Sequence, residues 1–261
     1  AIAELKNFRD QESGTALRSI ASCYLAKAIS GYHLQNQSER TDLEGVIPDN
    51  MEEWTNNIFQ DTIVKLCKEA LAPAHQLIQI NATDFAPLIN QGKDSRRLRP
   101  TLYDLLCHET LSIDEYDGHK TEALESLVKL HEADKDKSAF IYASIALINE
   151  KQGQNIYVPS RPMTKFGQQT GAGNSPEDDK FRQKTTALEE LLSQYKTEEA
   201  SLLIIEEIAN TYLENYEEVA NAATPYHVNK ICKEGISLFP KSIYVKNLDS
   251  ILKKISTPSL S

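Results

Sequence analysis

Apolar residues recur at intervals of three and four positions along most of the chain, and this periodicity constrains the fold more than any other feature. Between residues 15 and 35, for example, Leu17, Ile20, Tyr24 and Leu25 fall on one face of a helix. The 261 residues contain only 10 Gly and 10 Pro, too few for the many tight turns of an all-β protein. The pattern therefore predicts an all-α fold.

Two capping patterns mark expected helix starts in the first half of the chain. Asp49 as N-cap predicts a helix that carries the single tryptophan, Trp54, on its apolar stripe and ends at Pro73. Thr101 and Asp104 form a second capping pattern, and a carboxylate also suits the positive N-terminal end of a helix. Further helical segments are expected over residues 84–92, 120–132 and 137–150.

A long irregular segment over residues 151–175 interrupts the helical pattern, because six Gly and Pro residues fall within it. A loop of this length is unusual in a compact domain and is either functional or a mobile insertion. Its concentrated chemistry amounts to Arg161, Lys165 and a few aromatic residues. We therefore predict a mobile insertion.

Four helices are expected after this segment, at about 178–195, 198–215, 225–238 and 242–255. Antiparallel helix pairs with small residues at close approaches are typical of tetratricopeptide repeats, although the full Trp-Leu-Gly-Tyr signature is absent. The pattern predicts a tetratricopeptide-like, right-handed helical array. The small residues expected at close approaches are Ala187, Ala200, Ala209 and Gly235.

This organisation predicts an N-terminal helical subdomain over residues 1–150, the mobile insertion over 151–175 and a tetratricopeptide-like subdomain over 176–258. The two subdomains are expected to form one continuous α-helical unit. The start at Ala1, without Met, is expected to reflect a mature or trimmed chain.

The net charge disfavours two classes of partner. Lys and Arg number 28 and Asp and Glu number 38, so the formal charge is 28 − 38 = −10. Nucleic acids and anionic membranes attract clustered Lys and Arg, and we expect neither to be a partner. The sequence also lacks a stretch of 18 apolar residues, so no transmembrane segment is predicted.

The sequence predicts no catalytic, metal or cofactor site. The four cysteines, Cys23, Cys67, Cys107 and Cys232, lie among apolar residues without CxxC spacing, and we expect buried thiols. The six histidines include no HExxH pair, and the chain lacks phosphate-binding glycine motifs and a GxSxG elbow. Paired acids along the later helices are interpreted as solvated faces.

The nearest approach to a catalytic constellation is Cys107-His108-Glu109. Adjacent residues on a helix point about 100° apart, so these side chains do not converge. A non-enzymatic module is the preferred interpretation. A helical hydrolase that uses His108, Glu109 or the acidic pairs is a remaining alternative.

Stacked helix pairs can offer a concave surface to peptides, and tyrosines of the last four helices are the candidate lining. The same tyrosines could equally belong to the core, which is the slightly favoured interpretation. Burial of all four hydroxyls would exclude the groove. The candidate groove residues are Tyr195, Tyr212, Tyr216 and Tyr226.

One stretch of the chain resembles a known family. Asp84 to Ile89, a turn over 92–95 and the run Leu98-Arg-Pro-Thr-Leu-Tyr-Asp-Leu-Leu106 look like the N-terminal region of large alpha-2-macroglobulin family proteins of Bacteroides-type bacteria. Other pieces agree in order along the chain, including Trp54 and the closing Phe239-Pro-Lys-Ser242. The most specific residues of the resemblance are Arg99, Pro100, Thr101, Leu102, Tyr103 and Asp104.

The resemblance implies a helical, repeat-like region that precedes macroglobulin β-sandwich domains, which would begin near Ser261. It implies an exported parent protein in the periplasm or cell envelope that acts as a protease-trapping inhibitor, in some members through a bait region and a thioester. This sequence contains neither element.

The sequence thus predicts a helical interaction or scaffold module without a cofactor. Its expected partners are the parent's own β-sandwich domains, or envelope proteins and proteases. The alternative is a free-standing tetratricopeptide-like adaptor.

Overall fold

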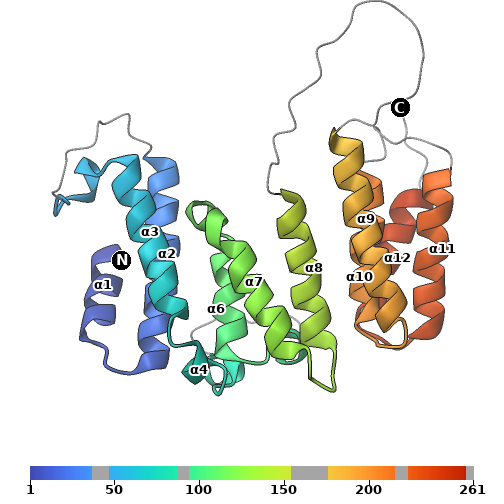
Figure 1. Cartoon of the computed structure of the whole chain (residues 1–261), viewed down its shortest axis with the longest axis horizontal. Coiled ribbons are helices and arrows are strands. Elements are labelled where there is room, and N and C mark those ends of the chain that lie inside the picture. The colour runs from blue at the N-terminus through green and yellow to red at the C-terminus, as the bar shows by residue number, and fades with distance from the viewer. Residues whose placement is uncertain (37–46, 87–93, 154–175, 215–222, 257–261) are drawn as a thin grey trace, which may run out of the picture. The chain divides into compact units, whose positions relative to one another are not determined.

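The computed structural model describes residues 1–36, 47–86, 94–153, 176–214 and 223–256. In these residues the chain forms twelve α-helices and three short 3-10 helices, without a β-strand (Figure 1). One isolated bridge joins Asn81 and Thr101. The predicted all-α fold is therefore confirmed. None of the described helices is long and apolar enough to cross a membrane.

The chain divides into two compact units, Ala1–Leu127 and Val128–Ser261. In the first unit, α2 and α3 pack along each other, α1 packs on α2, and α6 packs against both α2 and α3. Each of α2, α3 and α6 contributes fully buried side chains to the core of this unit, among them Cys23, Ile63 and Leu105. The elements of this unit are α1 (Ile2–Gln11), α2 (Thr15–Gln35), η1 (Met51–Glu53), α3 (Asn56–Leu71), α4 (Ala74–Leu77), η2 (Ala82–Phe85), α5 (Ser95–Leu98), α6 (Leu102–Thr110), η3 (Asp114–Tyr116) and most of α7 (Asp117–His131).

The helix that was expected to begin at Asp49 begins instead at Asn56. Thr55 caps it, since the Thr55 side chain accepts a hydrogen bond from the Ile58 N–H at 3.4 Å. Trp54 is extended and lies outside the helix, and its indole N–H donates to the carbonyl six residues earlier at 2.7 Å. This local hydrogen bond lies in a turn ahead of the helix. The 3-10 turn η1 in this segment is capped by Asn50, whose side-chain oxygen accepts from the Glu52 N–H at 3.1 Å, and not by Asp49.

The helix start predicted at Thr101 is confirmed as a complete capping box. The buried Asp104 carboxylate accepts from the Thr101 N–H at 2.9 Å and from its hydroxyl at 2.5 Å, while the hydroxyl accepts from the Asp104 N–H at 3.2 Å. The adjacent Leu102 N–H donates to the Ile80 carbonyl at 2.8 Å, and the Pro100 carbonyl accepts from the Ala82 N–H at 3.0 Å. The residues of the family resemblance thus start α6 and tie it to the segment before η2.

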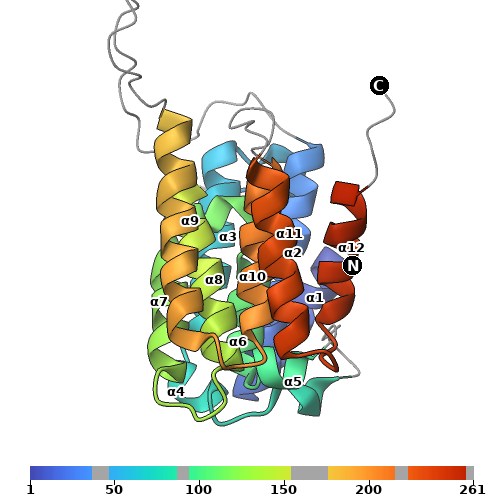
Figure 2. The ribbon, with the colours of Figure 1, turned by 90° about the vertical axis from the view of Figure 1, so that its right-hand side faces the viewer.

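The second unit contains a series of helices in which each packs on the next, and alternate helices also touch: α8 on α10, and α10 on α12 (Figures 1 and 2). Ile141 of α8 packs with Leu188 and Ile204 in one buried cluster, whereas Leu202 packs with Leu248 in a second cluster. The N-terminal subdomain expected over 1–150 includes α8, but α8 packs in the second unit. The helices are α8 (Ser138–Gly153), α9 (Pro176–Tyr195), α10 (Ser201–Glu214), α11 (Ala223–Leu238) and α12 (Val245–Ser256).

The tetratricopeptide-like arrangement is not confirmed. Alternate helices of the second unit start 223 − 176 = 47 and 245 − 201 = 44 residues apart. A tetratricopeptide repeat takes about 34 residues. Of the insertion expected over 151–175, the first three residues continue α8 to Gly153, and residues 154–175 lie outside the described residues.

Candidate functional site

The tyrosines expected to line a groove do not gather on one surface. Tyr195, at the end of α9, packs against Phe140 of α8 with ring centroids 5.3 Å apart. Tyr212, near the end of α10, packs edge-on against Phe181 at 5.1 Å. Because Phe181 lies in the first turns of α9 and Tyr195 at its end, the two tyrosines lie near opposite ends of that helix. Both are partly buried at the edges of the core clusters.

The remaining two tyrosines differ from this pair. Tyr226 on α11 is 73% exposed, whereas Tyr216 lies outside the described residues. The Tyr212 ring lies 4.9 Å from the ring of His227, and burial, with a smaller effect of Glu189, raises the pKa of the Tyr212 phenol. Tyr195 and Tyr212 thus act as packing residues in this structure, and Tyr226 alone of the described three offers an open ring.

The residues of the hydrolase alternative are held by other contacts. Glu109 forms an ion pair with Lys27, which joins α6 to α2. Cys107 is fully buried, and burial raises the pKa of its thiol. His108 is partly buried beside them. This geometry gives Glu109 a structural partner and leaves Cys107 protonated in the core.

All four cysteines are buried free thiols, as the sequence predicted. Burial raises the pKa of Cys67 to about 12 and that of Cys232 to about 11. A thiol is nucleophilic as its thiolate, so these groups are unreactive in the folded chain at neutral pH. Among the described residues, no three His, Cys, Asp or Glu side chains lie together in a way that could hold a metal ion.

The neighbouring acids Glu206 and Glu207 reach different helices. Glu207 pairs with Lys184 of α9 at 2.8 Å, whereas Glu206 accepts from the Asn247 amide of α12 at 2.9 Å. Adjacent residues of a helix point in different directions, which agrees with these separate partners. The pair therefore ties α10 to two neighbouring helices and does not form a dicarboxylate site.

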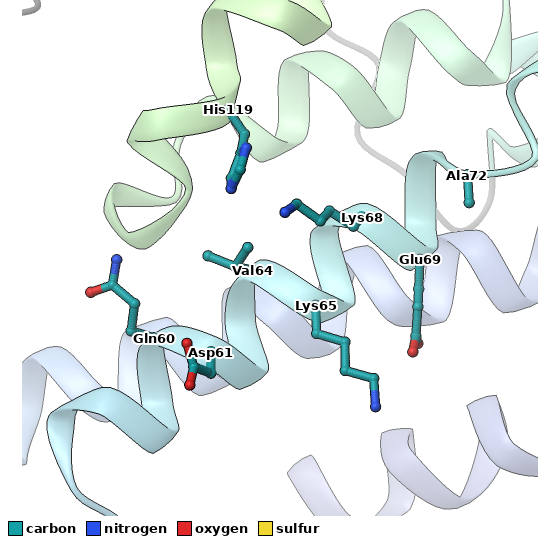
Figure 3. A pocket seen from close by; sticks show the side chains of 8 residues that line it. All are labelled: Gln60, Asp61, Val64, Lys65, Lys68, Glu69, Ala72 and His119. Carbon is teal, nitrogen blue, oxygen red and sulfur yellow. The ribbon is translucent and has the colours of Figure 1, made fainter.

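A hollow in the first unit lies between α3 and the start of α7 and measures about 740 Å³ (Figure 3). His119 of α7 faces Val64 and Lys68 of α3 across it. A second hollow of about 290 Å³ adjoins it and shares Lys68, Ala72 and His119. We call the two together the α3–α7 hollow. Its residues are Gln60, Asp61, Val64, Lys65, Lys68, Glu69, Leu71, Ala72, Tyr103, Tyr116, His119, Glu122, Ala123 and Ser126.

A groove in the second unit is formed by the end of α9, the start of α10 and the end of α11. Two adjoining spaces of about 240 Å³ and 430 Å³ share Lys196, Glu234 and Leu238. We call this surface the α9–α11 groove. Its residues are Glu189, Leu192, Ser193, Lys196, Ser201, Ile205, Ile231, Lys233, Glu234, Gly235, Ser237 and Leu238.

Gly235 lets α11 lie close to α10 at this groove. A Cβ at this position would lie 2.7 Å from the Ile205 Cδ1 and 2.9 Å from the Leu202 Cδ2, both inside van der Waals contact. The sequence analysis identified Gly235 as a close-approach residue, and the structure agrees. The buried Ile205 side chain therefore forms part of the groove floor.

The mouth of the groove combines apolar surface with charge. Leu238, at the end of α11, is 51% exposed although it adjoins the partly buried Ile231. The ammonium groups of Lys196 and Lys233 are exposed and form no ion pair within the described part of the chain. At the other end, a Glu189 oxygen lies 3.9 Å from the His227 Nε2. An open apolar floor with charged sides suits a segment of another polypeptide.

Sequence reasoning missed both surfaces. The Gln60, Val64 and Lys68 stripe is visible as an i, i+4, i+8 series, but its partner His119 comes from a helix about 50 residues later. The α9–α11 groove likewise needs helices that start 47 residues apart. Comparison of the chain with protein-family models, with curated proteins and with solved structures gives no match.

Proposed function

We propose that this chain is a non-enzymatic helical interaction module that binds a partner polypeptide in the α9–α11 groove. The observation that carries the proposal is the half-exposed Leu238 beside the apolar floor of Ile205 and Ile231. Burial of apolar surface contributes about 25 cal/mol per Å² to the free energy of association, so a partner that covers this surface is favoured. The charged side chains around it would orient the bound segment more than they would hold it.

We propose further that the module belongs to the N-terminal part of an alpha-2-macroglobulin-like protein of the bacterial envelope. The sequence resemblance of residues 99–104 supports this proposal. Within this stretch, Thr101 and Asp104 form the capping box that starts α6. On this proposal the first partner is a β-sandwich domain of the same parent, and envelope proteins or proteases are further partners. Protease trapping would then be an activity of the whole parent, in the periplasm.

The test measures binding of the 261-residue chain to the next domains of its parent by isothermal titration calorimetry. We expect micromolar association that Leu238→Glu weakens at least tenfold, since a buried leucine contributes about 1.5–3 kcal/mol. Ile47→Glu is the matched control, because Ile47 is 65% exposed and lies in the first unit. Equal binding by both variants, or no binding at all, would overturn the proposed groove.

Two further measurements separate the alternatives. A reading frame that ends near Ser261 would overturn the proposed parent and favour the free-standing adaptor. Turnover of peptide or ester substrates that is lost in His108→Ala would overturn the non-enzymatic assignment and favour the hydrolase. The calorimetric test of the groove requires a reading frame that continues beyond Ser261, whereas the turnover assay does not depend on the groove, so the three results can be distinguished.

A further inference from the structure

We propose that the α3–α7 hollow is a second binding site, one that takes a carboxylate-bearing ligand with an apolar body. The carboxylate would lie between the Lys68 ammonium and the His119 ring, and the apolar body would cover Val64 and Ala72. This site lies in the first unit and is independent of the α9–α11 groove.

Hydrogen-bond donors from two helices, α3 and α7, meet at the hollow. Gln60, Val64 and Lys68 follow one another at i, i+4 and i+8 on α3, so they form one stripe along the hollow. In Figure 3 the His119 ring extends from α7 and the Lys68 ammonium from α3, and both groups lie near Val64. Both groups present N–H donors, and a carboxylate can accept from two donors at once.

The Lys68 and His119 side chains are not engaged by other polar groups within the described residues. The Lys68 ammonium and the His119 ring make no hydrogen bond or ion pair there, although the His119 ring packs 5.3 Å from the Tyr116 ring. The Gln60 amide, by contrast, donates to the Glu115 carbonyl at 3.4 Å. An anion in the hollow would therefore gain donors without displacing an existing contact of Lys68 or His119.

The hollow is also lined by three carboxylates, those of Asp61, Glu69 and Glu122. Asp61, Lys65 and Glu69 form a neighbouring stripe of α3, and Figure 3 shows them projecting away from His119. Glu69 already accepts from the Arg9 guanidinium at 3.4 Å, so its charge is partly compensated. Glu122 of α7 lines the adjoining hollow and opposes an anion there. The lining as a whole has two lysines and three acids, 2 − 3 = −1, so the positive charge on the His119 side of α3 is that of Lys68 alone, with Glu122 as the opposing group.

Part of the lining of the hollow is apolar. Val64 and Ala72 line the larger hollow, and the adjoining hollow adds the largely buried Leu71, Ala123 and Tyr116. An inorganic anion would leave this surface in water. A ligand that carries an apolar group next to its carboxylate would cover it, which gives a gain of about 25 cal/mol per Å² buried.

The experiment titrates the full chain with 3-phenylpropionate and follows backbone amide and histidine ring signals by NMR. We expect saturable shifts at the residues of the hollow, with weaker binding of acetate, which lacks the apolar body. The neutral 3-phenylpropanamide, which lacks the charge, should bind roughly tenfold more weakly or not at all. A short peptide that ends in Phe with a free carboxylate serves as a second arm, and the tighter of the two probes identifies a small-molecule or a chain-terminal source.

Variants locate the site. Lys68→Met and His119→Gln should each weaken 3-phenylpropionate binding by roughly 3- to 10-fold, whereas Glu122→Gln should tighten it. Lys6→Met and His75→Gln are the matched controls, because both side chains are exposed and neither lines the α3–α7 hollow. Equal binding of the amide, absence of saturable shifts, or unchanged affinity in both Lys68→Met and His119→Gln would overturn the proposal. Circular dichroism verifies that each variant remains folded.

Discussion

The His33 imidazole of α2 and the Glu115 carboxylate of η3 face each other, with Nδ1 and Oε1 2.8 Å apart. Their side chains are only 14% and 7% exposed. The second Glu115 oxygen accepts from the Ser30 hydroxyl at 2.7 Å, and the other ring nitrogen of His33 lies 3.0 Å from the Asn56 side-chain oxygen. The His33 ring also stacks on Phe59, with centroids 4.6 Å apart. This network fastens η3 to α2 and to the start of α3.

The pH dependence of stability follows from the charge on Glu115. Burial alone would raise the pKa of this carboxyl, but hydrogen bonds from His33 and Ser30 outweigh it and hold the pKa below its usual value of 4.5. A group with a lowered folded-state pKa stabilises the fold above its unfolded pKa and loses that contribution as pH falls through the folded value. Glu115→Gln should therefore cost about 1–3 kcal/mol at pH 7 and progressively less below pH about 4.

Urea unfolding of the wild type and of Glu115→Gln at pH 7 and at pH 3 measures this difference. Glu53→Gln is the control, since Glu53 is exposed, and we expect it to leave the free energy of unfolding within about 0.5 kcal/mol of wild type at both pH values. A Glu115→Gln cost that stays constant between the two pH values would contradict the assignment.

Close packing at Gly235 gives a second prediction. Gly235→Ala would place a Cβ 2.7 Å from Ile205, so α11 must move away from α10 or the Ile205 side chain must leave its position. Overpacking of this kind costs about 1–3 kcal/mol, and the higher helix propensity of Ala offsets up to about 1 kcal/mol of it. We expect a net destabilisation of about 1–2 kcal/mol in chemical unfolding.

Gly31→Ala is the matched control for Gly235→Ala. Gly31 also lies inside a helix, but nothing lies within 4 Å of a Cβ placed there. Only the helix-propensity effect remains, so Gly31→Ala should stabilise the chain by up to about 1 kcal/mol. If Gly235→Ala and Gly31→Ala changed the free energy of unfolding in the same direction, the packing of α11 on α10 would not require a glycine at position 235.

The parts of the fold that were predictable are those fixed by short-range chemistry. The capping box of Thr101 and Asp104 needs residues three apart, so the sequence alone locates it. The predicted start of α3 was wrong because several residues ahead of this helix can act as a cap. Asn50 caps η1, whereas Thr55 caps α3. The choice between them depends on the Trp54 indole, which bonds to a carbonyl six residues away and so cannot be read from capping patterns.

The binding surfaces were unpredictable for a related reason. In the sequence of α11, Leu238 cannot be distinguished from a core leucine. Its side chain is half exposed because of the way the neighbouring helices pack. His119 likewise gains a meaning only when α7 lies beside Val64 and Lys68. Tertiary contacts between distant segments thus decide which side chains of an amphipathic helix remain available to a ligand.

The cap of α6 gives a third prediction, on stability. Asp104 is buried and accepts two hydrogen bonds from Thr101, so Asp104→Ala removes both and leaves two donors without their partner. We expect a loss of about 2–3 kcal/mol in the free energy of unfolding. Thr101→Ala should cost about 1 kcal/mol, the typical value for an N-cap, and Thr101→Ser should restore most of it because the hydroxyl returns. Equal stability of the Ala and Ser variants at Thr101 would show that the hydroxyl does not cap α6.

The buried thiols give a fourth prediction, on chemical reactivity. Thiol reagents attack the thiolate, and burial both shields the four sulfur atoms and raises the pKa of Cys67 to about 12 and of Cys232 to about 11. At pH 8 the folded chain should therefore react with a colorimetric disulfide reagent far more slowly than a free thiol does, and all four groups should react at once in 6 M guanidinium chloride.

Because Cys232 lies in the second unit and the other three in the first, slow reaction under native conditions reports opening of each unit separately. Adding Gly235→Ala should accelerate modification of Cys232 and leave Cys23, Cys67 and Cys107 unchanged, which mass spectrometry of the labelled chain can measure. Immediate reaction of any of the four thiols in the folded wild-type chain would contradict the burial on which this prediction depends.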